Sequence, residues 1–174
     1  MILLPTIADA EVVRLESTDM PRLSRLCMDC TDFFQLVEGQ PGGEVTAAGI
    51  LGSLAPDHAR GTSHVFGFQR NDELIGFAEL LEGYPSAREW CIGLLLLHPA
   101  DRGRGLGARL CTDILEWIRV QGGIAVRLVV QHQNPLARAF WERQGFSVEQ
   151  EAVLRAGRLS SPVWILLRPI GDAA

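Results

Sequence analysis

The sequence lacks the features of several large classes of protein. Its 174 residues include 16 basic and 21 acidic side chains, a formal net charge of −5, so it has no excess of basic residues for general nucleic-acid binding. No apolar run approaches the length of a membrane span. The N-terminal residues MILLPTIADA lack the basic start and long apolar core of a signal peptide. These absences indicate a soluble, cytoplasmic protein that binds neither nucleic acid nor membrane.

Cysteine is also scarce, with four residues in the chain. Cys27 and Cys30 have the C-x-x-C spacing of zinc and redox sites, but no second close pair of ligands follows them. Because the pair falls within a stretch of helical spacing, we expect two small buried side chains. The sequence therefore predicts no metal site and no disulfide framework.

The rest of the composition is that of an ordinary globular protein, with 47% hydrophobic and 21% charged residues. A chain of this length can bury a substantial core without covalent cross-links. It contains no internal repeat, low-complexity tract or linker. We therefore expect residues 1–174 to form a single domain.

Hydrophobic periodicity and turn residues predict alternating strands and helices. The chain order is a strand over Glu11–Ser17, a helix capped by Thr18 or Asp19 and ending at Gly39, a helix over Glu44–Leu54, strands over His64–Gln69, Glu73–Leu81 and Trp90–Leu97, a helix between Leu106 and Gly122, a strand over Ile124–Val130, a helix from Pro135 to Gly145, and strands over Ser147–Arg155 and Pro162–Leu167.

These elements indicate an α/β fold with a mixed, mostly antiparallel sheet flanked by helices. The short polar connection after Gln69 favours an antiparallel hairpin. The nearly unbroken apolar run Trp90–Leu97 is typical of a central strand covered on both faces. A helix links this run to the next strand, which predicts a right-handed parallel unit at the centre of the sheet.

The most informative stretch is HPADRGRGLGARL, residues 98–110, which follows the apolar run. A helix N-terminus presents unpaired N–H groups and a partial positive charge, and glycines let an anion approach the backbone closely. Arg102, Arg104 and Arg109 add the positive charge that the acidic chain otherwise lacks. The stretch predicts a phosphate or pyrophosphate site, and a simple solubilising turn is the alternative.

Two common phosphate-binding motifs fit this stretch poorly. A P-loop is excluded because no Gly-Lys-Ser/Thr follows the glycines. Gly103-x-Gly105-x-x-Ala108 matches a dinucleotide-binding fingerprint in form, but residues 98–102 separate it from the strand. The next strand also ends in Gln131-His132, without an acidic residue to bind a ribose. A nucleotide-binding oxidoreductase therefore stays a minor alternative.

Two motifs together resemble the GCN5-related N-acetyltransferase (GNAT) superfamily. Arg102-x-x-Gly105-x-Gly107, after an apolar strand and His98-Pro99, is similar to its coenzyme A signature. The segment NPLARAFWERQGF, residues 134–146, resembles its C-terminal motif, and the order of elements agrees over nearly the whole chain. The resemblance implies a GNAT-like fold and an enzyme that transfers the acetyl group of acetyl-CoA to a primary amine by direct attack on the thioester.

The resemblance also implies where the cofactor binds. The strand before the glycine loop splays away from the next parallel strand, the pantetheine arm lies in the gap, and the pyrophosphate rests on the loop. The implied cofactor-binding residues are Leu95, Leu96, Leu97, Arg102, Gly103, Arg104, Gly105, Leu106, Gly107, Asn134 and Trp141.

The catalytic groups depart from the family pattern. The helix after the asparagine often carries a tyrosine as general acid, but this chain has Trp141 there, and Tyr84 lies in a different loop. An indole N–H donates hydrogen bonds but is not a useful proton source. As general base we expect Glu79, directly or through water, with His132 as the second candidate. The missing tyrosine keeps a catalytically inactive acyl-CoA-binding module as the alternative function.

The acceptor is expected to be a small-molecule or peptide amine. The parts least typical of the superfamily, the helical region over residues 33–54 and the loop around Tyr84, are expected to bind it. The net acidic charge favours a cationic acceptor, and a polyamine, an antibiotic amine, an amino acid and a protein amino group all stay open. A homodimer is compatible with the sequence.

Overall fold

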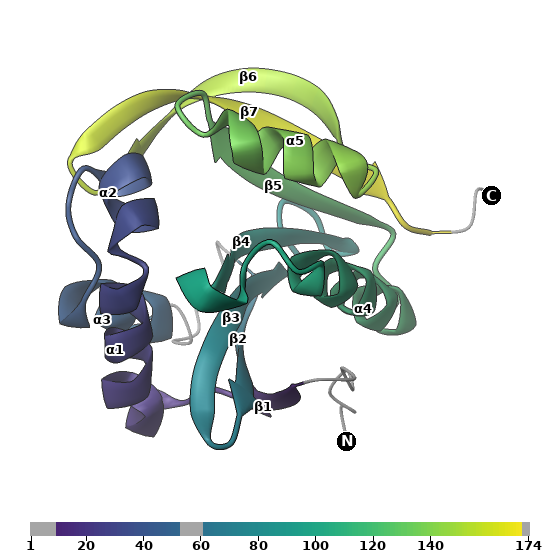
Figure 1. Ribbon diagram of the computed structural model, residues 1–174. Coiled ribbons are helices and arrows are strands. Elements are labelled where there is room, and N and C mark those ends of the chain that lie inside the picture. Colours follow the sequence, from purple (N-terminus) through teal and green to yellow (C-terminus); the bar gives the residue numbers. More distant parts are fainter. Residues whose placement is uncertain (1–9, 53–60, 172–174) are drawn as a thin grey trace.

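A seven-stranded sheet organises the protein, as the computed structural model of residues 10–52 and 61–171 shows (Figure 1). The strand order is β1-β2-β3-β4-β5-β7-β6. Neighbouring strands run antiparallel except for β4 and β5, which run parallel. The strands are β1 (Glu11–Arg14), β2 (Thr62–Arg70), β3 (Glu73–Glu82), β4 (Glu89–Leu97), β5 (Ala125–Gln131), β6 (Ser147–Ala156) and β7 (Leu159–Pro169). The prediction of a mixed α/β sheet with a central parallel pair is confirmed.

Helices cover both faces of this sheet. They are α1 (Met20–Asp29), α2 (Thr31–Glu38), α3 (Glu44–Gly52), α4 (Leu106–Val120) and α5 (Pro135–Arg143), with short 3-10 turns at Ser17–Asp19 and Pro99–Asp101. Side chains of α1, α2 and α3 form one apolar core with the sheet, and those of α4 and α5 form a second. Figure 1 shows the first three helices together on one side of the molecule. Neighbouring residues of β2 divide between the two cores, since Val65 belongs to the first and Phe66 to the second.

Two of the predicted elements that differ from the observed ones lie near the start of the chain. The first strand ends at Arg14 instead of Ser17, because Glu16 and Asp19 cap each other and turn the chain into a 3-10 helix. The single helix expected up to Gly39 is broken at Cys30, whose backbone is not helical, and α2 starts at Thr31. The predicted end of the following helix, after Gly52, lies outside the described residues.

The two cysteines of the C-x-x-C pair are core residues. Cys27 and Cys30 are fully buried free thiols in the core beneath α1 and α2. Burial raises the pKa of Cys27 to about 12, so its thiol is neutral at physiological pH. The prediction of two small buried side chains is confirmed.

The central parallel strands diverge after a short paired segment. Pairing of β4 with β5 runs from Glu89 opposite Ala125 to Ile92 opposite Leu128 and then stops. Beyond that point β4 still pairs with β3, up to Leu97, and β5 still pairs with β7. A gap therefore opens between two strands that are each held from their other side. The expected splay is confirmed.

An arginine on β5 anchors the paired end of these strands. Arg127 donates from Nε to Glu89 at 2.7 Å and forms an ion pair with Glu149 on β6. The hydrogen bond from Arg127 lowers the pKa of the Glu89 carboxyl below its ordinary value. Both side chains are about one-fifth exposed, so solvent screens this pair only in part.

We expect Glu89→Gln to destabilise the protein by about 1 kcal/mol near neutral pH, because the ion pair to Arg127 is lost. The pKa of Glu89 in the folded protein lies below its unfolded value of about 4.3. The ion pair therefore stabilises the protein fully above the unfolded pKa, and this stabilisation is lost as the pH falls through the folded pKa. Urea unfolding measured from neutral pH down to about pH 3.5 should show the free energies of unfolding of the wild type and of Glu89→Gln approaching each other.

The control is Glu116→Gln, which removes the same charge from an exposed pair with Arg119 on α4. This variant should unfold like the wild type throughout. A difference for Glu89→Gln that does not change with pH would contradict the assigned ion pair.

Candidate active site

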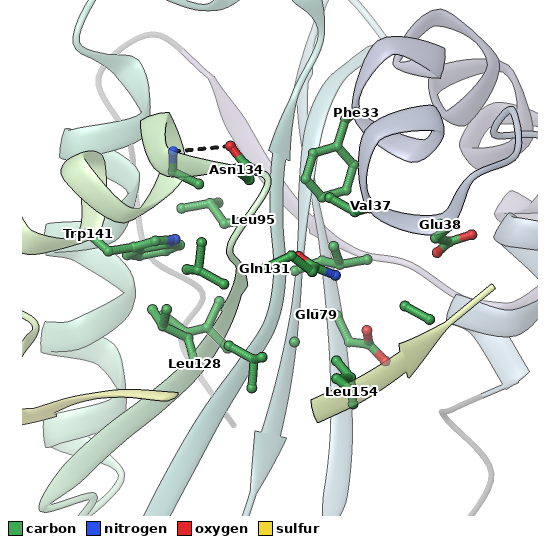
Figure 2. A pocket seen from close by; sticks show the side chains of 17 residues that line it. Phe33, Val37, Glu38, Glu79, Leu95, Leu128, Gln131, Asn134, Trp141 and Leu154 are labelled. Carbon is green, nitrogen blue, oxygen red and sulfur yellow. Dashed lines mark hydrogen bonds between the residues drawn. The ribbon is translucent and has the colours of Figure 1, made fainter. Parts of the chain in front are cut away.

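Three adjoining cavities run from the glycine loop across the gap to α3. The loop cavity, about 550 Å³, lies between the end of β4, the glycine loop and α5. The gap cavity, about 290 Å³, lies between the diverging parts of β4 and β5 (Figure 2). The outer cavity, about 280 Å³, lies between α2, α3 and the strands β3 and β4. The first two share Phe33, Leu95, Asn134, Ala137 and Trp141, and the last two share Glu38, Glu79 and Leu94.

The loop cavity contains the start of α4. Gly103 and Gly105 have φ of 74° and 78°, the left-handed region that favours glycine. Gly105 is the N-cap of α4 and offers no side chain to the first turn of the helix. The N–H groups of this turn are therefore left for a ligand, and Gly105 and Gly107 line the cavity beside them. This arrangement suits an anion.

Arg102 at the start of the loop is bonded to the protein itself. Its Nε donates to the Leu97 carbonyl at 2.8 Å, and its two terminal nitrogens donate to both carboxylate oxygens of Asp32 on α2, at 2.5 and 3.3 Å. These bonds hold the pKa of the Asp32 carboxyl below its ordinary value. Arg102 thus ties α2 to the loop, and the backbone of the loop is the main donor set for an anion.

One edge of β4 is open in the gap. The His98 N–H donates to Ile75 of β3 at 2.8 Å, so His98 faces β3. Backbone groups of successive residues face opposite edges of a strand, so those of Leu97 and Leu95 face away from β3. The bond from Arg102 to the Leu97 carbonyl agrees with this direction. The backbone of Leu95, beyond the last β4–β5 pair, is therefore available to an extended ligand.

The start of α5 forms the opposite wall. Asn134 caps this helix by accepting a hydrogen bond from the Ala137 N–H at 3.2 Å. Trp141 is only 8% exposed and packs edge-on against Phe140 and Phe146. Asn134 and Trp141 both line the loop and gap cavities, so they border the passage between them.

Glu79 brings a carboxylate to the far end of the gap cavity, away from Trp141 and Asn134 (Figure 2). It lies on β3 opposite Leu94, where Gly93 forms a bulge in β4. A Cβ atom on Gly93 would lie 3.0 Å from the Glu79 Oε2, so the glycine leaves room for the carboxylate. Burial, reinforced by the charge of Glu79, raises the pKa of nearby Cys91 to about 11, so that thiol is neutral.

Comparison with known proteins identifies the family. The profile of the acetyltransferase (GNAT) family matches residues 31–146, which include the glycine loop, Glu79 and all of α5. The chain belongs to the GNAT family. The resemblance seen in the sequence is thereby confirmed.

Solved GNAT structures share this fold at low sequence identity. An acetyl transferase from Salmonella typhimurium, described as modifying the N-terminal serine of the 50S ribosomal subunit protein L7/L12, is 18% identical with a TM-score of 0.78 over 95% of this chain and 98% of its own. The PaiA N-acetyltransferase of Thermoplasma acidophilum, solved in complex with coenzyme A, is 20% identical with a TM-score of 0.68 over 92% of this chain and 98% of its own.

Curated relatives match over shorter segments. The mycothiol acetyltransferase of Thermobispora bispora is 42% identical over 66 residues, which are 38% of this chain and 19% of the relative. The matched part is thus about a fifth of the length of that relative.

The GNAT structure brings most of the predicted cofactor residues to the cavities. Two of them do not line the loop cavity: Arg104, and Leu106, whose side chain is buried in the core beneath α4. The predicted residues that line it are Leu95, Leu96, Leu97, Arg102, Gly103, Gly105, Gly107, Asn134 and Trp141.

The two predicted bases have different positions. Glu79 lines the gap and outer cavities, whereas His132 lines none of the three. The His132 ring stacks on Trp164 with the centroids 3.9 Å apart, and its Nε2 is buried without a hydrogen-bond partner among the described residues. Tyr84 is 41% exposed and lines none of these cavities either. Position therefore favours Glu79 and gives no support to His132.

Sequence reasoning did not single out Glu38 or Gly93. Glu38 reaches two cavities because of the way α2 packs against the sheet, which has no local signal. Gly93 did have a local signal in the sequence, because a glycine inside an apolar strand often marks a bulge.

Within residues 10–52 and 61–171, no group of three or more His, Cys, Asp or Glu residues could hold a metal ion. In the same part of the chain, no helix is long and apolar enough to cross a membrane.

We expect Gly105→Asp to weaken coenzyme A binding at least about tenfold, because it adds a negative charge at the start of α4. Gly105→Asn is the matched control: it has nearly the same shape, and both residues tolerate the left-handed backbone better than other side chains do. Calorimetric titration with coenzyme A measures both affinities, and thermal unfolding checks both folds. Equal losses for Asp and Asn would show that shape matters here and charge does not.

Proposed function

We propose that this chain, as a single domain over residues 1–174, transfers the acetyl group of acetyl-CoA to a primary amine. The observation that carries the proposal is the continuous series of cavities from the uncapped start of α4, past the open edge of β4, to Glu79. The names of the relatives support it, because they are acetyltransferases and the Thermoplasma neighbour was solved with coenzyme A.

The residues of this chain fit coenzyme A in charge and in backbone geometry. The N–H groups of the first turn of α4 would hold the pyrophosphate, with Gly103, Gly105 and Gly107 allowing close contact. The open backbone edge at Leu95 would hold the amide-containing arm as a strand is held, and the Asn134 side chain would contact it from the other wall. When bound, acetyl-CoA supplies the thioester carbon that the amine attacks and the thiolate that leaves.

Glu79 is assigned the role of general base. An alkylamine with a pKa of about 10.4 is protonated near neutral pH and must be neutral to attack. It loses one proton to solvent before the reaction and a second as the nitrogen–carbon bond forms. The Glu79 carboxylate accepts that second proton, directly or through a water molecule, and passes it to solvent.

Departure of the thiolate needs less help. A thiol has a pKa of about 8.5, below the value of about 10.4 for an alkylamine, so its anion leaves more readily than the amine does. The ionisable side chains that line the gap cavity are Glu38 and Glu79, and Trp141 occupies the place of the usual tyrosine. The thiolate therefore takes its proton from water. The absence of any other side-chain acid among the described residues that line this cavity fits slow or moderate turnover and does not require an inactive binding module.

We expect Glu79→Gln to lower kcat about 100-fold or more while changing the affinity for coenzyme A less than about twofold, because the carboxylate lies in the gap cavity and outside the loop cavity. Release of free thiol with a panel of primary amines measures kcat, and calorimetry measures the affinity. Glu116→Gln, on the far part of α4, is the charge-matched control.

His132→Gln, assayed with the same panel, decides between the two predicted bases. A loss as large as that of Glu79→Gln would move the role to His132. Tight binding of coenzyme A without turnover of any amine would instead favour the inactive acyl-CoA-binding module.

Gly93→Ala is expected to lower kcat about tenfold without weakening coenzyme A binding, because the new methyl group would press on the Glu79 carboxylate. Combined with Glu79→Gln it should cause little further loss, since both changes affect one group. Gly52→Ala is the control, because a Cβ there meets no atom within 4 Å. Full additivity of the two losses would contradict the contact between Gly93 and Glu79.

A further inference from the structure

The gap and outer cavities differ in charge from the loop cavity. Arg143 and Arg102, the latter paired with Asp32, line the loop cavity beside the uncapped start of α4. The ionisable side chains that line the gap and outer cavities are Glu38 and Glu79, and no basic side chain among the described residues lines either one. The passage therefore runs from a positive end, suited to a phosphate, to a negative end, suited to a cation.

Glu38 has a fixed position at this negative end. It is the last residue of α2, and its carbonyl accepts a hydrogen bond from the Arg158 N–H at 2.8 Å in the turn between β6 and β7. Gln40 Nε2 lies 3.5 Å from its carboxylate. The C-terminal end of a helix carries a partial negative charge, which adds to the attraction for a cation.

Apolar side chains surround the two carboxylates. Leu94 lines both cavities with Glu38 and Glu79, Val37 lines the gap cavity, and Val45 and Ile50 line the outer cavity. Figure 2 shows Glu38 near α2 and Glu79 near the end of β6 that carries Leu154. A ligand that meets both carboxylates must therefore also contact aliphatic side chains.

We infer that the acceptor is an aliphatic diamine, one amine facing Glu79 for reaction and the other held as an ammonium by Glu38. The inference rests on the proposed function, and the methylene chain between the amines matches Leu94, Val45 and Ile50. A monoamine would leave Glu38 without its cation, and an ω-amino acid would bring a second carboxylate against it. Glu38 is thus the residue that determines specificity.

The test compares cadaverine, pentylamine and ω-aminopentanoate, which share one chain length, in the thiol-release assay. We expect kcat/KM for cadaverine to exceed that for pentylamine about tenfold, with ω-aminopentanoate slower still. Shorter and longer diamines then locate the optimum length. The sequence contains no lysine, so thiol release without added amine cannot come from acetylation of the protein's own lysines.

Glu38→Gln provides the discriminating variant. It should raise KM for cadaverine about tenfold, leave kcat nearly unchanged and leave pentylamine unaffected, because the distant ammonium loses its partner. Glu116→Gln, with the same change in net charge, should leave the preference for cadaverine intact. Equal rates for cadaverine and pentylamine, or equal effects of Glu38→Gln on both, would overturn the inference.

A binding measurement separates this inference from the proposed function. Cadaverine is titrated into the protein saturated with coenzyme A, for the wild type and for Glu38→Gln. Binding that depends on Glu38 without any acetyl transfer would leave the diamine site standing and refute the proposed reaction. Transfer to amines without binding that depends on Glu38 would refute the diamine site alone.

Discussion

The end of β4–β5 pairing at Ile92 and Leu128 is the constraint on which the rest of the site depends. Buried backbone N–H and C=O groups need hydrogen-bond partners, and two strands that part inside a sheet leave a row of them without any. The sheet stays intact because β4 remains hydrogen-bonded to β3 and β5 remains hydrogen-bonded to β7 on their other edges. The open edge then presents its backbone groups in a defined direction to a proposed ligand, and the bulge at Gly93 marks where it begins.

Charge is distributed along the same line. The protein has a net charge of −5, yet the start of α4 is locally positive because its first N–H groups are uncapped, and Arg143 lines the cavity beside them. Carboxylates gather at the other end, on α2 and β3. An acidic protein can thus hold an anion by local geometry, and the same acidity lowers the energy of a cation at the opposite end of the passage.

The sequence was most informative where function depends on neighbouring residues. Gly103 and Gly105 lie between a buried strand and an amphipathic helix, and Asn134 precedes a proline, so loop, helix start and cap were all predictable from local chemistry. The orientation of the His132 ring could not be predicted from the sequence, because it depends on stacking against Trp164, a residue far along the chain. The role of Glu38 depends on how α2 packs over the sheet, and Cys30 interrupts its helix without a glycine or proline to mark the break.

The bond between Asp32 and Arg102 has a consequence for how two ligands interact. The helix α2 holds the glycine loop through Asp32, lines the passage with Phe33 and reaches the outer cavity with Glu38. One helix of eight residues therefore touches both proposed binding regions. Coupling free energy between two sites is reciprocal. If coenzyme A changes the affinity for the acceptor through a shift of α2, the acceptor must change the affinity for coenzyme A by the same factor.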